Sequence, residues 1–161
     1  MAAEPALVPR AQTTSPDLQA GRFGIRTDGL PLLLPQRVPI EFLVNVKVYP
    51  VPRAMPRLLG LTNLRGHAVP VFDMGSAAAR PLPVIHSRNV LVLGEGTDAL
   101  GLAGCQPPEA LEPLRPAPPV APAAWQAAVD SCWEEADCGR RWWSFDRDRL
   151  IDRLVTATAL A

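Results

Sequence analysis

The sequence has few of the residues that usually carry catalysis or bind metals. Its 161 residues include two histidines, His67 and His86, and three cysteines, Cys105, Cys132 and Cys138. They form neither a Cys-x-x-Cys nor a His-Glu-x-x-His pattern, and no glycine-rich segment opens a helix as a phosphate-binding loop does. The sequence therefore predicts no catalytic residues, no metal site and no cofactor.

The chain also lacks net charge and long apolar runs. Sixteen basic residues balance sixteen acidic ones, which removes the simplest electrostatic argument for nucleic acid or an anionic membrane as a partner. No window is apolar enough for a membrane-spanning helix, and the first 20 residues lack the apolar core of a signal peptide. An odd number of cysteines suits a reducing compartment. We expect a cytoplasmic protein that neither binds nucleic acid nor inserts into membranes.

Proline, by contrast, is abundant. Nineteen prolines exclude long helices through most of the chain, because proline lacks the amide donor and clashes in helix interiors. About eight to ten short apolar runs, separated by glycine-rich turns and divided by a loop at 76–88, predict small β-barrels. Apolar spacing near the end predicts one short helix, with Asp146 or Asp148 as its N-cap. We therefore predict an all-β fold with a short C-terminal helix.

Composition also suggests how the chain is organised. Residues 1–20 are rich in Ala, Pro, Thr and Ser and predict a flexible leader. Residues 21–155 hold the folded domain, and 156–161 form a tail. The domain consists of two β subdomains, and its residues 107–124 carry seven prolines in eighteen positions, which predicts an extended surface crossing or loop.

Two other functions stay open at this point. A small zinc or redox protein would use Cys132 and Cys138, although their five-residue gap is not a standard zinc pair. A single-strand nucleic-acid-binding barrel would use the arginines and tryptophans of 140–143. The same aromatic residues also fit a strand whose alternate side chains face the core, which argues against nucleic-acid binding.

The segment GLTNLRGHAVPVFDM, residues 60–74, reads as a β-hairpin with an arginine at its tip. Asn63 and Gly66 are residue types that turns favour. Arg65 either solvates the tip or presents its planar donor fork to a partner's carboxylate or carbonyl group. The local pattern alone does not decide between the two.

A series of ordered motifs surrounds this hairpin. They are Val38-Pro39-Ile40-Glu41, a bend with two prolines ending at Gly60, Asn63-Leu64-Arg65-Gly66, and Pro70-Val71-Phe72-Asp73. In order and spacing they resemble the CheW-like family of chemotaxis coupling proteins. The later part of the chain matches less well, because Gly104-Cys105 stands where the family has Val-Asp.

The resemblance implies two five-stranded, SH3-like barrels packed side by side and no catalytic residues. It implies an adaptor that links the cytoplasmic tip of a chemoreceptor to the regulatory domain of a CheA-type histidine kinase. The chain also resembles the adaptors of pilus-linked (twitching) chemosensory systems. The residues that the resemblance assigns to partner binding are Val38, Glu41, Asn63, Arg65 and Gly66, and those that it assigns to shaping the turn are Gly60 and Gly66.

Overall fold

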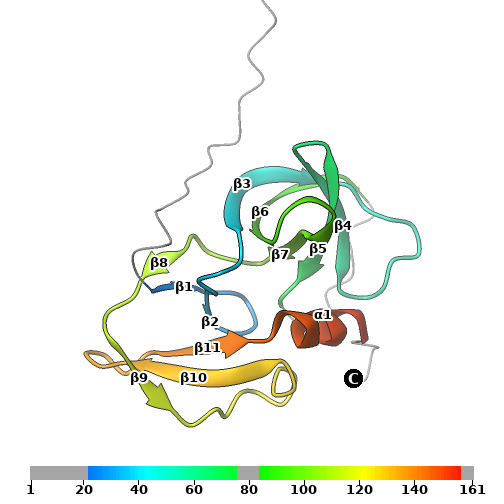
Figure 1. Ribbon diagram of the computed structural model, residues 1–161. Helices are drawn as coiled ribbons and strands as arrows, with labels where there is room; N and C mark the ends of the chain where they lie inside the picture. The colour runs from blue at the N-terminus through cyan, green and yellow to red at the C-terminus, as the bar shows by residue number, and fades with distance from the viewer. Residues whose placement is uncertain (1–21, 76–83, 157–161) are drawn as a thin grey trace, which may run out of the picture.

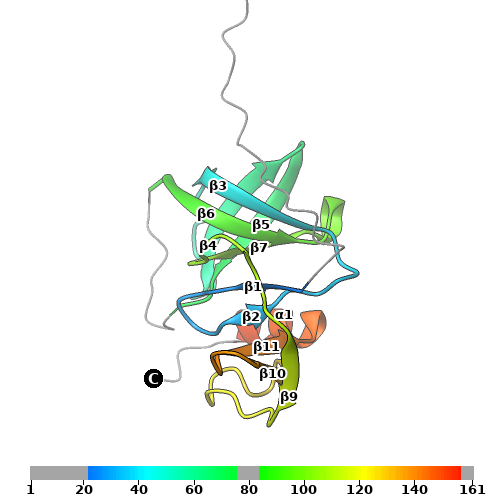
Figure 2. The same ribbon diagram turned by 90° about the vertical axis from the view of Figure 1, so that its left-hand side faces the viewer.

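In the described part of the chain, the fold consists of two β-sheets, one α-helix and the short 3-10 helix η1 (Gly96–Asp98) (Figures 1 and 2). The structure is a computed structural model, and it describes residues 22–75 and 84–156. One sheet has five strands in the order β3 (Ile40–Val48), β6 (His86–Leu93), β7 (Leu100–Ala103), β5 (His67–Asp73) and β4 (Leu58–Leu64). The other has six strands in the order β8 (Glu109–Ala110), β1 (Phe23–Ile25), β2 (Leu32–Leu33), β11 (Arg141–Phe145), β10 (Val129–Glu135) and β9 (Leu114–Ala117).

The five-stranded sheet closes on itself into a barrel. A β-bridge between Tyr49 and Leu61 joins its two edge strands, with both backbone N–H···O bonds at 2.8 Å. Gly60 permits this contact, because a Cβ at that position would lie 2.2 Å from the carbonyl oxygen of Tyr49. Closure leaves no free edge at this point of the sheet.

Both faces of the second half of strand β6, residues 90–93, are buried. Val90 and Val92 pack in the interior of the five-stranded barrel, whereas Leu91 and Leu93 point to the opposite face and join a second apolar cluster. Because side chains alternate along a strand, a strand buried on both faces needs the continuous apolar run that the sequence has here.

The second apolar cluster lies between the two barrels and holds them together. It combines residues of both sheets with the C-terminal helix α1 (Arg147–Thr156), which contributes Leu150 and Leu154. Asp146 caps this helix by accepting a hydrogen bond from the backbone N–H of Arg149 (2.9 Å). The buried members of this shared core are Ile25, Leu30, Leu32, Leu34, Phe42, Phe72, Met74, Leu91, Leu93, Leu100, Leu102, Cys105, Trp125, Ala128, Val129, Leu150 and Leu154.

A buried arginine also crosses the boundary between the barrels. Arg57 donates to the carbonyl oxygens of Asp73 (3.0 Å) and Gly75 (2.9 Å), and its guanidinium lies 4.9 Å from the ring centroid of Trp125. Burial, followed by the nearby charge of Arg153, lowers the pKa of Arg57. Arg57 thus ties β4 and β5 of one barrel to the segment that leads into β10 of the other.

The six-stranded sheet is built around Trp142. This side chain is 1% exposed, and its indole N–H donates to Glu135 at 2.9 Å. Glu135 is itself 1% exposed and pairs with Arg140 at 2.9 Å. Burial opposes ionisation of Glu135, but the hydrogen bonds from Trp142 and Arg140 outweigh it and lower the pKa of this carboxyl group.

The observed architecture confirms the predicted all-β fold of two small barrels with a short C-terminal helix. One prediction about its division is wrong. Of the predicted loop at 76–88, residues 76–83 lie outside the described residues and His86 to Arg88 belong to β6. Strands β5 and β6 share one sheet, so the division between the two sheets does not fall there. The proline-rich crossing at 107–124 contributes two strands, β8 and β9, and joins opposite edges of the six-stranded sheet.

The predicted leader lies outside the described residues, and of the predicted tail only Thr156, the last residue of α1, is described. Strand β3 does not alternate regularly, because its pairing shifts between Leu43 and Val46 and Asn45 has a positive φ of 56°. Among the described residues, no helix has the length and apolarity to cross a membrane.

Candidate partner-binding site at the β4–β5 turn

The turn between β4 and β5 has two central residues, Arg65 and Gly66. The last paired residues on either side are Leu64 and His67. Both central residues have positive φ angles, 51° for Arg65 and 84° for Gly66, as a type I′ turn requires. The side chain of Asn63 supports the turn by accepting a hydrogen bond from the backbone N–H of Gly66 (3.0 Å). The hairpin is therefore tight and well defined.

Arg65 forms a two-pronged ion pair with Glu41 on strand β3. Its two terminal nitrogens donate to the two carboxylate oxygens at 2.9 and 3.1 Å. The side chain of Arg65 is 70% exposed and that of Glu41 is 14% exposed. Glu41 lies two residues before Leu43, which packs in the interior of the five-stranded barrel. The ion pair therefore joins the hairpin tip to the start of the strand on the far edge of the same sheet.

The other two assigned residues take different positions. Val38 is partly buried and packs against the shared core, just before β3 begins. Gly60 lies inside β4, where the pairing register with β5 shifts. It contacts the backbone of Tyr49 closely, and this contact is part of the barrel closure. The turn itself is shaped by Asn63 and Gly66.

This arrangement offers a partner one directional polar contact on a rigid support. A bidentate arginine fork matches a carboxylate in geometry as well as in charge. The Arg65 side of the ion pair is open to solvent, whereas Glu41 is largely covered, so a partner's carboxylate can reach the exposed face of the guanidinium. The sequence gives no local signal for the pairing of Arg65 with Glu41, because the two residues are 24 positions apart and meet only through barrel closure.

The cysteines take positions that do not favour the zinc or redox alternative. Cys132 is 2% exposed, whereas Cys138 is exposed, and all three cysteines are free. In the described part of the chain, one group of side chains could hold a cation, and it combines Cys138 with Glu135 and Asp137 rather than with Cys132. Burial raises the pKa of the Cys132 thiol and, with Asp28 and Asp73 nearby, raises that of Cys105 to about 12. Both thiols are therefore weak nucleophiles.

The tryptophans of β11 do not form the stacking platform that the nucleic-acid alternative needs. Trp142 is buried with its N–H bonded to Glu135, and Trp143 is half-buried against the shared core. Proteins that bind single strands stack successive bases on exposed aromatic rings. Trp142, the residue on which that alternative depends, is a core residue.

Comparisons with known proteins agree with this architecture. Residues 37–112 match the sequence model of the CheW-like domain. No curated protein matches the chain. Among solved structures, the chain is similar to the scaffolding protein TtCheW from Thermoanaerobacter tengcongensis, with 16% sequence identity and a TM-score of 0.52 over 78% of this chain and 88% of that one. The matched residues contain the whole five-stranded sheet and the β4–β5 turn.

Proposed function

Because the chain belongs to the CheW-like family, we propose that it is a non-enzymatic adaptor that couples chemoreceptors to a CheA-type histidine kinase. The adaptor would belong either to a chemotaxis system or to a pilus-linked (twitching) chemosensory system. The structural observation that carries it is the exposed Arg65 fork on a tight turn, above the motif from Val38 to Glu41.

In this proposal, the receptor tip docks where the β4–β5 turn meets the start of β3. A carboxylate of the receptor binds Arg65, and apolar receptor side chains pack near Val38. The regulatory domain of the kinase uses a different surface of the chain. Each contact is small and transient, and affinity rises when many receptors and kinases assemble in one array.

The test is calorimetric titration of the full chain with a receptor-tip fragment and, separately, with the kinase regulatory domain. Four proteins are compared: the wild type, Arg65→Glu, Glu41→Arg and the charge-swapped double variant. The double variant restores the internal ion pair but reverses the charge that the surface presents. We expect Arg65→Glu to weaken receptor binding at least tenfold and the double variant not to recover it.

The matched control is Arg115→Glu on the other barrel. Arg115 pairs with Glu134 at an exposure similar to that of the Arg65–Glu41 pair, 62% and 17% for the two side chains, and it should leave receptor binding unchanged. Recovery in the double variant would mean that Arg65 acts only through Glu41. Wild-type protein that binds neither partner would reject the adaptor proposal itself.

A further inference from the structure

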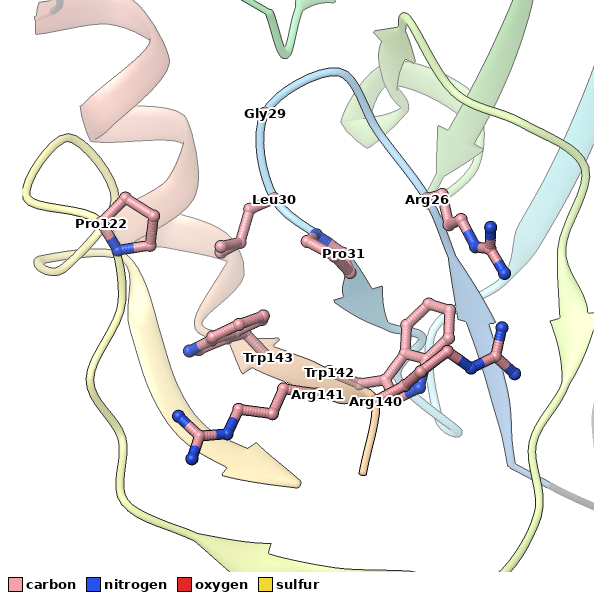
Figure 3. Close-up of a pocket in the computed structure, with 9 residues that line it drawn as sticks. All are labelled: Arg26, Gly29, Leu30, Pro31, Pro122, Arg140, Arg141, Trp142 and Trp143. Atoms are coloured by element: carbon pink, nitrogen blue, oxygen red, sulfur yellow. The ribbon is translucent and has the colours of Figure 1, made fainter. Parts of the chain in front are cut away.

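The six-stranded barrel carries a cavity of about 370 Å³ at the turn between β1 and β2 (Figure 3). Leu30 and Pro31 of this turn face Trp143 of β11, and Pro122 lies beside them. These side chains give the cavity apolar walls. The volume is at the lower end of the range of small-ligand pockets, which suits one large side chain better than an extended ligand.

Three arginines line the cavity, and none of its described lining residues is acidic. Figure 3 shows Arg26 and Arg140 on one side and Arg141 on the other. An apolar floor with guanidinium groups on two sides favours a ligand that is apolar at its centre and negatively charged around it.

The glutamates near these arginines are unevenly distributed. Glu109 pairs with both Arg26 (3.2 Å) and Arg140 (3.3 Å). Arg140 also pairs with the buried Glu135 (2.9 Å), so these two glutamates balance Arg26 and Arg140. The excess positive charge lies at Arg141 and its neighbour Arg115. Glu134 pairs with Arg115 and, more distantly, with the Nε of Arg141 (3.5 Å). A guanidinium has five N–H donors, and the contacts of Arg141 within the described residues involve its Nε, so it retains donors for another carboxylate.

We propose that this cavity docks an acidic peptide segment of a partner protein, with a large apolar side chain of that segment inserted against Trp143. The apolar anchor is buried between the β1–β2 turn and β11, and the flanking carboxylates bind Arg141 and the exposed Arg26. Buried aromatic and aliphatic anchors with surrounding charged contacts are the usual energetic centres of protein interfaces.

This surface is separate from the β4–β5 turn. In both ribbon views, β2 and β11 lie outside the five-stranded sheet, on the side away from the tip of the β4–β5 hairpin. The inference stands whether or not Arg65 contacts a receptor. If both hold, the chain has one docking surface on each barrel, and a single copy can engage two partners at once.

The experiment is selection of a random 12-residue peptide display library on the full chain. We expect enrichment of sequences in which acidic residues flank a large apolar residue. A selected peptide is then synthesised and titrated into ¹⁵N-labelled protein, where the indole N–H signal of Trp143 should shift. Arg141→Glu and Arg26→Glu, both exposed and expected to fold, should each weaken binding at least fivefold.

Controls separate this site from the proposed receptor site. Arg65→Glu should bind the peptide as the wild type does, and replacing the peptide's apolar anchor with alanine should abolish binding. No enrichment, enrichment of peptides without acidic residues, or affinity unaffected by both arginine variants would each overturn the proposal. Enrichment of basic peptides would do the same.

Discussion

Arg65 holds a backbone conformation that most residues avoid. Its φ of 51° lies in the left-handed region, which costs a residue with a Cβ about 1–2 kcal/mol. Asparagine and glycine adopt this conformation more easily at the first central position of a type I′ turn. The ion pair with Glu41 is 70% exposed on the arginine side and returns about 0–1 kcal/mol. At this position, stability alone therefore favours a residue other than arginine.

We predict that Arg65→Asn leaves the free energy of unfolding unchanged or raises it by up to about 1 kcal/mol. Relief of backbone strain should equal or exceed the loss of the ion pair. Urea unfolding followed by circular dichroism measures the change. A loss of more than about 1 kcal/mol would show that the ion pair is a structural element, and would weaken the case for Arg65 as a partner contact.

The β10–β11 hairpin depends on a buried carboxylate. Glu135 accepts hydrogen bonds from Trp142 and Arg140 on or beside the facing strand, and also from the backbone N–H of Glu112 (3.3 Å). These contacts hold the pKa of Glu135 below its ordinary value of 4.5 in spite of its burial. The ionised form therefore stabilises the hairpin above the unfolded-state pKa, and this contribution is lost as the pH falls through the folded-state value.

We predict that Glu135→Gln lowers the free energy of unfolding by about 2 kcal/mol at pH 7. The difference between wild type and variant should shrink below pH 4.5, because the wild-type carboxyl group then becomes protonated. Urea unfolding at a series of pH values measures this, with Glu95→Gln in an exposed loop as the control. A difference that stays constant down to pH 2 would contradict the assigned role of the charge.

Local elements were predictable where neighbouring residues decide them. The hairpins β1–β2, β4–β5, β6–β7 and β10–β11 follow from short apolar runs around turn residues such as Asp28-Gly29 and Arg65-Gly66. The bulge in β3 was not predictable, because Val44 fits the alternation of a regular strand and yet is 44% exposed. The polar side chain of Asn89 on β6 accepts a hydrogen bond from the backbone N–H of Asn45 at this bulge.

At the scale of the whole molecule, the sequence could not show which strands share a sheet. The parallel pairs β5–β7 and β11–β2 join segments far apart in the chain, and only the overall packing brings them together. The same applies to the candidate site. The exposed position of Arg65 at a turn was predictable, but its pairing with Glu41 and the cavity beside Trp143 depend on long-range contacts.

The shared core predicts that the two barrels unfold together. All four tryptophans lie in or beside the six-stranded sheet, so their fluorescence reports on that half of the molecule. Leu59 is 1% exposed in the interior of the five-stranded barrel. A destabilising substitution at Leu59 should shift the tryptophan fluorescence transition only if the two halves unfold as one unit.

We predict that Leu59→Ala lowers the free energy of unfolding by about 3 kcal/mol. The tryptophan fluorescence transition should shift to lower urea concentration together with the circular dichroism transition. Val44→Ala, at an exposed position of the same barrel, should shift neither by more than about 0.5 kcal/mol. A fluorescence transition that stays in place while circular dichroism shifts would mean that the barrels are independent.

As an adaptor, one copy of the chain should bridge two signalling partners. Sedimentation velocity of the full chain mixed with a receptor-tip fragment and the kinase regulatory domain measures this bridging. We expect a complex that contains all three proteins and that loses the receptor fragment when the chain carries Arg65→Glu. Mixtures in which the chain sediments alone, or in which the two partners exclude each other, would contradict the bridging role.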